Sequence, residues 1–224
     1  MSLAKEAFSL QVIEAMKEQN VIFASNSDEV HEIFHANNDT DLITNAACLD
    51  LMIRKWKRID EQSPSWSLLE GARVLDIASG SCNNNYVFSR WDPHFSRFCA
   101  VNGAEVVAID IRAQSDLDKL LFTTVQADLI PLVQQGRLAE VAELKGKKFD
   151  IIHSGSFVGF NPAPDLEWRL GGRDALRQFE KQLSYLCVQL LAEGGVISLD
   201  IRDRHYNRVI QKMVNGKLVN SDDN

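Results

Sequence analysis

Hydrophobic spacing divides the chain into a helical first part and an alternating second part. In residues 1–70 apolar side chains recur at every third or fourth position, which predicts amphipathic helices. The clearest helix follows the start signal Asp39-Thr40-Asp41, and its apolar face would consist of Leu42, Ala46, Leu49, Ile53 and Trp56. No strand pattern occurs before residue 72. We interpret residues 1–70 as a helical lid or cap and residues 71–224 as the main domain.

From residue 73 onward, short apolar runs alternate with helical segments. The runs cover residues 74–77, 106–109, 122–127, 149–152 and 196–199. Apart from the weaker run 122–127, they are mainly apolar rather than alternating, which is typical of strands that helices cover on both faces. The sequence therefore predicts an α/β fold with a Rossmann-like, parallel-dominated sheet, helices on both faces and an N-terminal helical region.

Proline and glycine mark several expected boundaries. Asp92-Pro93 predicts a helix start with Pro93 at the first helical position. We expect Glu193-Gly194-Gly195 to end the long helix that precedes the last apolar run. Asn215-Gly216, between apolar residues, predicts a hairpin over residues 213–218.

Composition limits the kinds of partner and compartment. A formal charge of −7 argues against a surface that follows nucleic-acid phosphates. The basic stretch 54–58 falls in the last turn of the predicted helix, where cations complement the helix dipole. The four cysteines form no CxxC pair and have no histidine at metal spacing, which predicts no metal site and a reducing compartment. No apolar run approaches the ~18 residues of a membrane helix, so we expect a cytoplasmic protein without a membrane segment.

The first strand ends in a turn of small residues. Ala78, Ser79 and Gly80 follow the run 74–77, and the second run ends in the carboxylate Asp110. A strand, a tight turn, a helix and a second strand with a terminal acid are typical of a site for an adenosine-type cofactor. The turn lets the backbone approach the ligand, and the acid accepts hydrogen bonds from ribose hydroxyls.

The glycine pattern and Asp76 distinguish between cofactors. A dinucleotide site usually has the pattern G-x-G-x-x-G, but only Gly80 is a glycine here and Ala78 and Cys82 flank it. Asp76 lies inside the first strand, where a cofactor with a positively charged amino-acid tail can use a carboxylate. An NAD-dependent oxidoreductase would explain Asp110 but not Asp76.

Residues 72–201 resemble the class I S-adenosylmethionine-dependent methyltransferases. Segment 74–82 resembles the family's hh(D/E)hxxGxG motif, with Cys82 in place of its last glycine. Segments 106–111, 126–129, 149–154 and 190–197 resemble the second to fifth strand motifs, in the correct order. The sixth and seventh strands of the family would have to be compressed into the 213–218 hairpin.

The resemblance implies S-adenosylmethionine as cofactor and a set of contact residues. Asp110 would bind the ribose and Asp128 the adenine amino group, although Asp128 has the alternative of capping the following turn. The implied cofactor-binding residues are Asp76, Ala78, Ser79, Gly80, Asp110, Ile111, Asp128, Leu129 and Ser154.

The fourth strand of the family faces the methyl group, so His153 is the first candidate for a general base. The alternative is a histidine that is hydrogen-bonded to a neighbouring loop. His205 and Tyr206 are candidates of lower rank.

The methyl acceptor is expected to be a small molecule methylated on oxygen or nitrogen. The fourth strand continues as Ser154-Gly155-Ser156-Phe157, without the Asn/Asp-Pro-Pro-aromatic motif of related amine methyltransferases and without a nucleophilic cysteine. Together with the net acidity, these absences disfavour nucleic acid as the substrate. Arg169 and Arg173 would bind an acidic group of the substrate or would be solvated charges.

A second hypothesis is a methyltransferase-like subunit that binds the cofactor or a partner without turnover. It is motivated by Cys82, the short C-terminal part and the N-terminal helices, through which an oligomer would form.

Overall fold

The computed structural model describes residues 10, 40–59, 66–80, 93–155, 157, 165–199 and 209–220. Its strands are β1 (Arg73–Ile77), β2 (Glu105–Asp110), β3 (Thr123–Gln126), β4 (Phe149–His153), β5 (Leu191–Ser198), β6 (Gln211–Val214) and β7 (Lys217–Asn220). Its α-helices are α3 (Thr40–Lys57), α4 (His94–Val101), α5 (Asp118–Leu121), α6 (Leu129–Gln134), α7 (Leu166–Leu170) and α8 (Arg173–Leu190). Two 3-10 helices, η1 (Trp66–Leu69) and η2 (Leu138–Glu140), complete the described elements.

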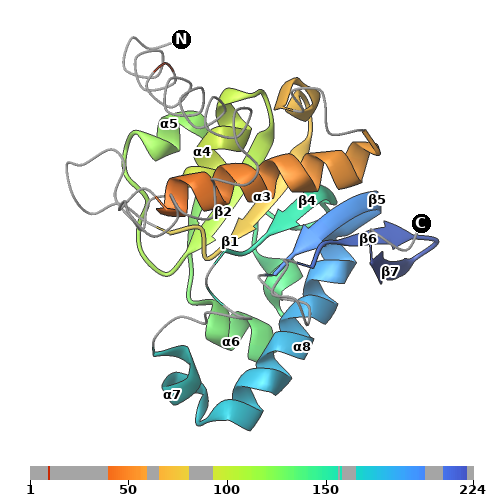
Figure 1. Cartoon of the computed structure of the whole chain (residues 1–224). Coiled ribbons are helices and arrows are strands. Elements are labelled where there is room, and N and C mark those ends of the chain that lie inside the picture. Colours follow the sequence, from red (N-terminus) through yellow and green to blue (C-terminus); the bar gives the residue numbers. More distant parts are fainter. Residues whose placement is uncertain are drawn as a thin grey trace.

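The strands form one seven-stranded sheet in the order β3-β2-β1-β4-β5-β6-β7 (Figure 1). Strands β1 to β5 pair in parallel, and β6 and β7 add an antiparallel hairpin at the β5 side. The predicted α/β fold with a parallel-dominated sheet is confirmed. The chain runs outward from β1 to β3 and then returns to place β4 on the other side of β1. Ligands of open α/β sheets bind at such a reversal, beyond the carboxyl ends of the strands.

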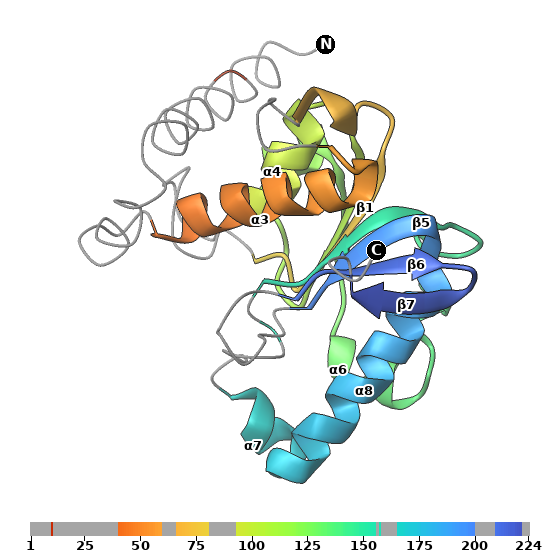
Figure 2. The same ribbon diagram turned by 45° about the vertical axis from the view of Figure 1, so that its right-hand side comes forward.

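Helices cover both faces of the sheet (Figures 1 and 2). On one face, Leu49 and Met52 of α3 and Phe98 of α4 pack in one core with Val74 and Val106. On the opposite face, α6 and α8 pack over the alternate side chains of the same strands. This two-sided burial explains why the central strands β1, β2 and β4 are mainly apolar, whereas the edge strand β3 carries exposed polar residues. Since α3 belongs to residues 1–70, the helical region shares a core with the sheet, and the boundary at residue 70 stays a prediction.

Helix α3 agrees with the expected helix after Asp39-Thr40-Asp41, and its last turn carries the basic residues Arg54, Lys55 and Lys57. A cation of β6 also contacts the carbonyl groups at this end of the helix, since Lys212 Nζ donates to Trp56 O at 3.0 Å. The helices expected nearer the N-terminus lie outside the described residues. In the part of the chain that is described, no helix has both the length and the apolar character needed to cross a membrane.

Two expected boundaries are wrong by a few residues. Helix α4 begins at His94, so Pro93 occupies the N-cap position and not the first helical position. Helix α8 ends at Leu190, and Glu193-Gly194-Gly195 belong to β5, which begins at Leu191. The pairing of β5 with β4 is irregular here. A Cβ atom on Gly195 would lie 2.9 Å from the carbonyl oxygen of Ala192 and 3.0 Å from that of Asp150. The glycine therefore allows close backbone packing within β5 and against β4.

The predicted C-terminal hairpin is confirmed. Asn215 and Gly216 both have positive φ, at 50° and 73°, as a two-residue hairpin turn requires. The backbone N–H of Asn215 donates to Glu193 Oε1 at 2.7 Å, which ties the turn to β5.

Candidate cofactor site

The turn after β1 has an unusual backbone. Ala78 and Gly80 both have positive φ, at 52° and 87°. The N–H of Ser79 donates to the carbonyl of Ile109 at 3.1 Å, so the turn continues along the end of β2. Only glycine adopts such conformations without cost. The turn therefore carries strain at Ala78 and an open backbone at Gly80, at the carboxyl edge of the sheet.

Asp110 ends β2 beside this turn. Its Oδ2 accepts a hydrogen bond from the N–H of Gly80 at 3.0 Å, and its Oδ1 accepts one from the N–H of Arg112 at 2.9 Å. Burial raises the pKa of Asp110 above its usual value, while the hydrogen bonds from the backbone of Arg112 and Gly80 act in the opposite direction. The next residue, Ile111, is 47% exposed, which is high for an apolar side chain of its size. The predicted pair of small-residue turn and strand-end acid is thus in contact.

Asp76 and His153 lie side by side on β1 and β4, where they are register partners. Asp76 Oδ1 and His153 Nδ1 are 2.9 Å apart, and Ser96 Oγ of α4 donates to Asp76 Oδ2 at 2.6 Å. The two side chains are 1% and 2% exposed. Both carboxylate oxygens of Asp76 therefore have protein partners, so a bond to a ligand ammonium would have to share one of them. The assignment of Asp76 to the cofactor stays a prediction.

The surroundings of His153 favour its charged form. The ring of Phe95 stacks on the imidazole with centroids 3.7 Å apart and planes 10° apart. Burial lowers the pKa of His153, but hydrogen bonds to Asp76 and Cys48 outweigh burial and raise this pKa to about 9. The imidazole is therefore protonated at neutral pH. The sequence offered two interpretations of His153, a general base or a hydrogen-bonded histidine. This arrangement resembles the second, although the partner is the carboxylate of Asp76 in β1 and not a loop. The role of general base stays untested.

Asp128 lies at the start of α6 and caps it. Its Oδ1 accepts from the N–H of Ile130 at 3.0 Å, and its Oδ2 is 2.7 Å from Nη2 of Arg169 in α7. The capping alternative raised by the sequence is present in the structure. It does not decide the adenine contact, because carboxylate oxygens can accept more than one hydrogen bond. Arg169, expected to bind an acidic group of the substrate or to be a solvated charge, is partly exposed and pairs with this acid.

Two further predicted contact residues are buried. Leu129, the first residue of α6, packs in the core. Ser154 follows β4, and its N–H donates to the carbonyl of Ser198 at 2.9 Å. The hydroxyl groups of Ser154 and Ser198 are buried, and neither has a hydrogen-bond partner among the described residues. Ser198 is the register partner of His153 on β5. The assignments of Leu129 and Ser154 to the cofactor are not tested by these positions.

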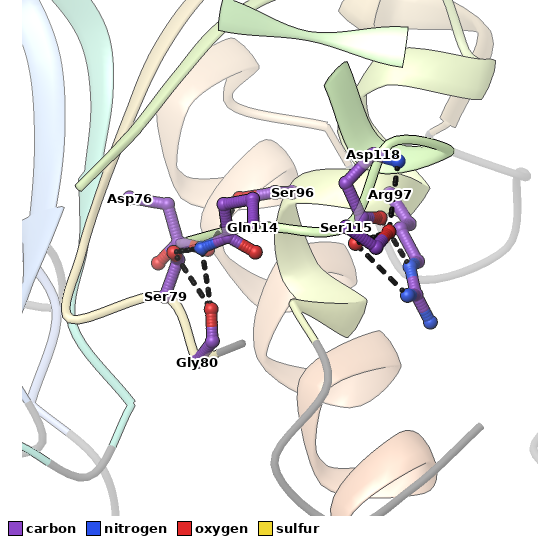
Figure 3. A network of polar contacts seen from close by, with 8 residues as sticks. All are labelled: Asp76, Ser79, Gly80, Ser96, Arg97, Gln114, Ser115 and Asp118. Carbon is purple, nitrogen blue, oxygen red and sulfur yellow. Dashed lines mark hydrogen bonds and ion pairs between the residues drawn. The ribbon is translucent and has the colours of Figure 1, made fainter. Parts of the chain in front are cut away.

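Sequence reasoning missed a polar network around the loop that follows Asp110 (Figure 3). Gln114 Nε2 donates to Ser79 Oγ at 2.9 Å and also to the carbonyl of Gly80. At the far end of the loop, Arg97 and Asp118 form a buried bidentate ion pair with bonds of 2.7 and 3.1 Å. The only signal in the sequence is the run of polar residues after the second strand, which is also typical of a solvated loop.

Some expectations fall outside the described residues, namely those on Cys82, His205 and Tyr206. Arg173 is described as the first residue of α8, without any contact that would assign it to a substrate. Within the described ranges, no group of three or more His, Cys, Asp or Glu side chains is arranged to hold a metal ion.

Comparisons with known proteins give structural likeness at low sequence identity. No protein-family model and no curated protein matches the chain. Among solved structures, MycE methyltransferase of the mycinamycin biosynthetic pathway, in complex with Mg and SAH, is 16% identical over 80% of this chain, with a TM-score of 0.41. This chain covers 44% of that MycE chain, less than half of its length.

Two further solved structures have similarly low scores. Streptomyces venezuelae DesVI is 13% identical over 85% of this chain and 71% of its own, with a TM-score of 0.43. Human methyltransferase-like protein 13, in complex with SAH, is 15% identical over 70% of this chain and 63% of its own, with a TM-score of 0.35. Values this low carry no conclusion about ligand or reaction. The order β3-β2-β1-β4-β5 and the parallel direction of these five strands nonetheless agree with the class I methyltransferase fold that the motifs resemble, and β6 and β7 follow as a sequential hairpin at the β5 edge.

Proposed function

We propose that this chain binds S-adenosylmethionine at the carboxyl edge of the sheet and transfers its methyl group to a small-molecule acceptor. The observation that carries the proposal is the contact between Gly80 and Asp110 at the end of β1 and β2. An open glycine backbone beside a strand-end carboxylate, next to the reversal in strand order, is the arrangement that receives an adenosine in open α/β folds.

The residues around this contact suit an adenosine. Asp110 would bind the ribose hydroxyls, since a carboxylate oxygen that already accepts one backbone N–H retains a free lone pair. Ile111 offers an exposed apolar side chain beside Asp110, against which an aromatic base would pack. Asp128, at the N-terminus of α6, would accept from the adenine amino group. The positive φ of Ala78 and Gly80 keeps the backbone of the turn close to the ligand.

Bound S-adenosylmethionine supplies an electrophilic methyl group, and the protein then has to align the acceptor and exclude water. His153 is our candidate base for an acceptor hydroxyl or amine. A base must first lose its own proton, and the pKa of about 9 places that loss in alkaline solution. If His153 is the base, the turnover rate rises with pH up to this pKa, and a His153→Gln variant lacks that rise.

The acceptor class rests on charge and on the sequence after β4. The formal charge of −7 disfavours a polyanionic substrate. The residues after β4, Ser154-Gly155-Ser156-Phe157, also lack the Asn/Asp-Pro-Pro-aromatic motif of related amine methyltransferases.

The test is calorimetric titration with S-adenosylmethionine and S-adenosylhomocysteine, with Asp110→Ala as the site variant and Asp116→Ala as the control. Asp116 is an exposed acid in the same loop and pairs with Lys119. We expect micromolar binding that Asp110→Ala weakens at least tenfold, about 1.4 kcal/mol, and that Asp116→Ala leaves unchanged. NAD(H) should not bind. Absence of binding to well-folded wild-type protein would refute the proposal.

The second candidate is a cofactor-binding or partner-binding subunit without turnover. The observation that favours it is the pairing of Asp76 and His153 with each other, which leaves both groups inside the protein. Binding of S-adenosylhomocysteine without methyl transfer to a broad panel of small acceptors would support this candidate over the first.

A further inference from the structure

Gln114 connects the loop after β2 with the turn after β1 (Figure 3). Its side-chain amide donates to the hydroxyl of Ser79 at 2.9 Å and to the carbonyl of Gly80. The side chain is 4% exposed, so these hydrogen bonds form away from bulk water. An amide held in this way fixes the distance between the loop and the turn.

Gln114 and Asp110 hold the same residue from opposite sides. Asp110 accepts from the N–H of Gly80 at 3.0 Å, and Gln114 donates to the carbonyl of Gly80. Gly80 has a φ of 87° and no side chain, so its own conformation restrains it weakly. Gln114 is thus a second restraint on the position of Gly80, beside the hydrogen bond to Asp110.

The side-chain oxygen of Gln114 lacks a hydrogen-bond donor in the described part of the chain. This atom, Oε1, is buried. A buried acceptor without a donor costs about 1–3 kcal/mol, whereas an apolar side chain of the same shape would avoid that cost. Stability alone does not favour glutamine at this position, and the orphan oxygen lies next to the turn proposed to receive a ligand.

The loop that carries Gln114 is anchored at its far end. Ser115 Oγ donates to Asp118 Oδ2 at 2.6 Å, and Asp118 pairs with Arg97 of α4 at 2.7 Å. Arg97 and Asp118 are 2% and 0% exposed. Gln114 thus extends from a rigid base, which is the property required of a residue that orients a binding site.

We propose that Gln114 is a positioning residue of the ligand site, which holds Gly80 against Asp110 so that the carboxylate meets the two ribose hydroxyls in a fixed orientation. The inference rests on the proposed function for the identity of the ligand. The geometric part, the restraint of Gly80 by Gln114, is independent of any ligand and can be tested on the free protein.

The test compares Gln114→Met with Gln126→Met. Methionine keeps the length of the side chain and removes both the bonds and the orphan oxygen. Gln126 is the matched control, because its exposed amide donates to the carbonyl of Ile111 in the same loop, at 3.3 Å. For Gln114→Met we expect a melting temperature close to that of the wild type and at least a tenfold loss of affinity for S-adenosylhomocysteine. For Gln126→Met we expect less than a threefold change.

Two further measurements separate positioning from general damage. Hydrogen exchange at the Gly80 amide should accelerate in free Gln114→Met and not in Gln126→Met. In a double-variant cycle with Asp110→Asn, the losses of affinity should be non-additive, because Gln114 acts through the same contact. Ser79→Ala, which removes only one acceptor of Gln114, should give a smaller loss and serves if the Met variant does not fold.

The outcomes distinguish the two proposals. If wild-type protein does not bind S-adenosylhomocysteine, the proposed function fails, and Gly80 exchange still decides whether Gln114 restrains the turn. If the wild type binds and Gln114→Met binds equally well with unchanged Gly80 exchange, the positioning role is overturned. Additive losses with Asp110→Asn, or a large fall in melting temperature without loss of affinity, would also overturn it.

Discussion

His153 Nδ1 lies 2.9 Å from Oδ1 of Asp76, and both side chains are buried between the sheet and its covering helices. The pair is a product of the topology, because the return of the chain after β3 places β4 beside β1 and makes the two residues register partners. Ser96 of α4 donates a hydrogen bond to the other carboxylate oxygen of Asp76. A buried ion pair of this kind is costly to break, since removal of one partner leaves the other charge unpaired.

The first prediction concerns the pH dependence of stability. The pKa of His153 is about 9 in the folded protein and 6.5 without perturbation. Because the folded-state pKa is the higher one, the stabilisation is complete below pH 6.5 and is lost as the pH rises through about 9. The difference corresponds to roughly 3 kcal/mol. Urea unfolding of the wild type at acidic, neutral and alkaline pH measures it.

His153→Gln is the control, because it keeps a hydrogen-bonding side chain without the charge change. The stability advantage of wild type over this variant should shrink between pH 6.5 and 9. A constant difference across that interval would show that the imidazole of His153 does not keep its second proton in the folded state.

The fold and the outline of the site could be predicted from local sequence. Strands buried on both faces give continuous apolar runs, and Asp76 and Asp110 stand out because a carboxylate is rare in or at the end of such runs. The turn at Gly80 and the hairpin at Gly216 were predictable because positive φ selects particular residues. Each of these signals lies within a few positions along the chain.

The contacts of the site could not be predicted in the same way. Asp76 and His153 are 77 residues apart in sequence, and Ser96 reaches Asp76 from a helix 20 residues away. Gln114 has no periodic pattern around it, and its role follows only from the approach of two strand ends. Such pairs are set by strand order and helix placement, on which local propensity carries no information.

The second prediction concerns the buried ion pair of Arg97 and Asp118. Arg97→Met should destabilise the protein by about 3–5 kcal/mol, because it leaves the Asp118 carboxylate unpaired in the core. The exposed pair of Arg137 and Glu140 has the same distance of 2.7 Å, so Arg137→Ala is a control at equal geometry. It should cost no more than about 1 kcal/mol. Equal losses for the two variants in urea unfolding would contradict the assigned role of burial.

The third prediction concerns backbone strain at Ala78. Its φ of 52° places the backbone in the left-handed region, where the Cβ atom of an L-residue costs about 1–2 kcal/mol. Ala78→Gly should therefore stabilise the protein by up to about 1 kcal/mol after the entropy of the unfolded glycine is counted. Gly71→Ala is the reverse control. Gly71 has a φ of 73° and open space where a Cβ would lie, so this variant should lose stability through the backbone conformation only.

The fourth prediction separates the two roles of Asp128. Asparagine is as good an N-cap as aspartate, so Asp128→Asn should keep the cap of α6 and change the free energy of unfolding by less than about 1 kcal/mol. Its amide nitrogen cannot accept a hydrogen bond from an adenine amino group. If Asp128 binds adenine, calorimetry should show a five- to tenfold loss of S-adenosylhomocysteine affinity.

The control for this prediction is Arg169→Gln, which removes the partially exposed ion pair with Asp128 and leaves the carboxylate in place. Because Arg169 and adenine would compete for the same oxygen, this variant should bind S-adenosylhomocysteine as well as or better than the wild type. Loss of affinity in Arg169→Gln would instead assign the guanidinium to the ligand. Unchanged affinity in Asp128→Asn would leave Asp128 with the cap as its function and would place adenine recognition on other residues.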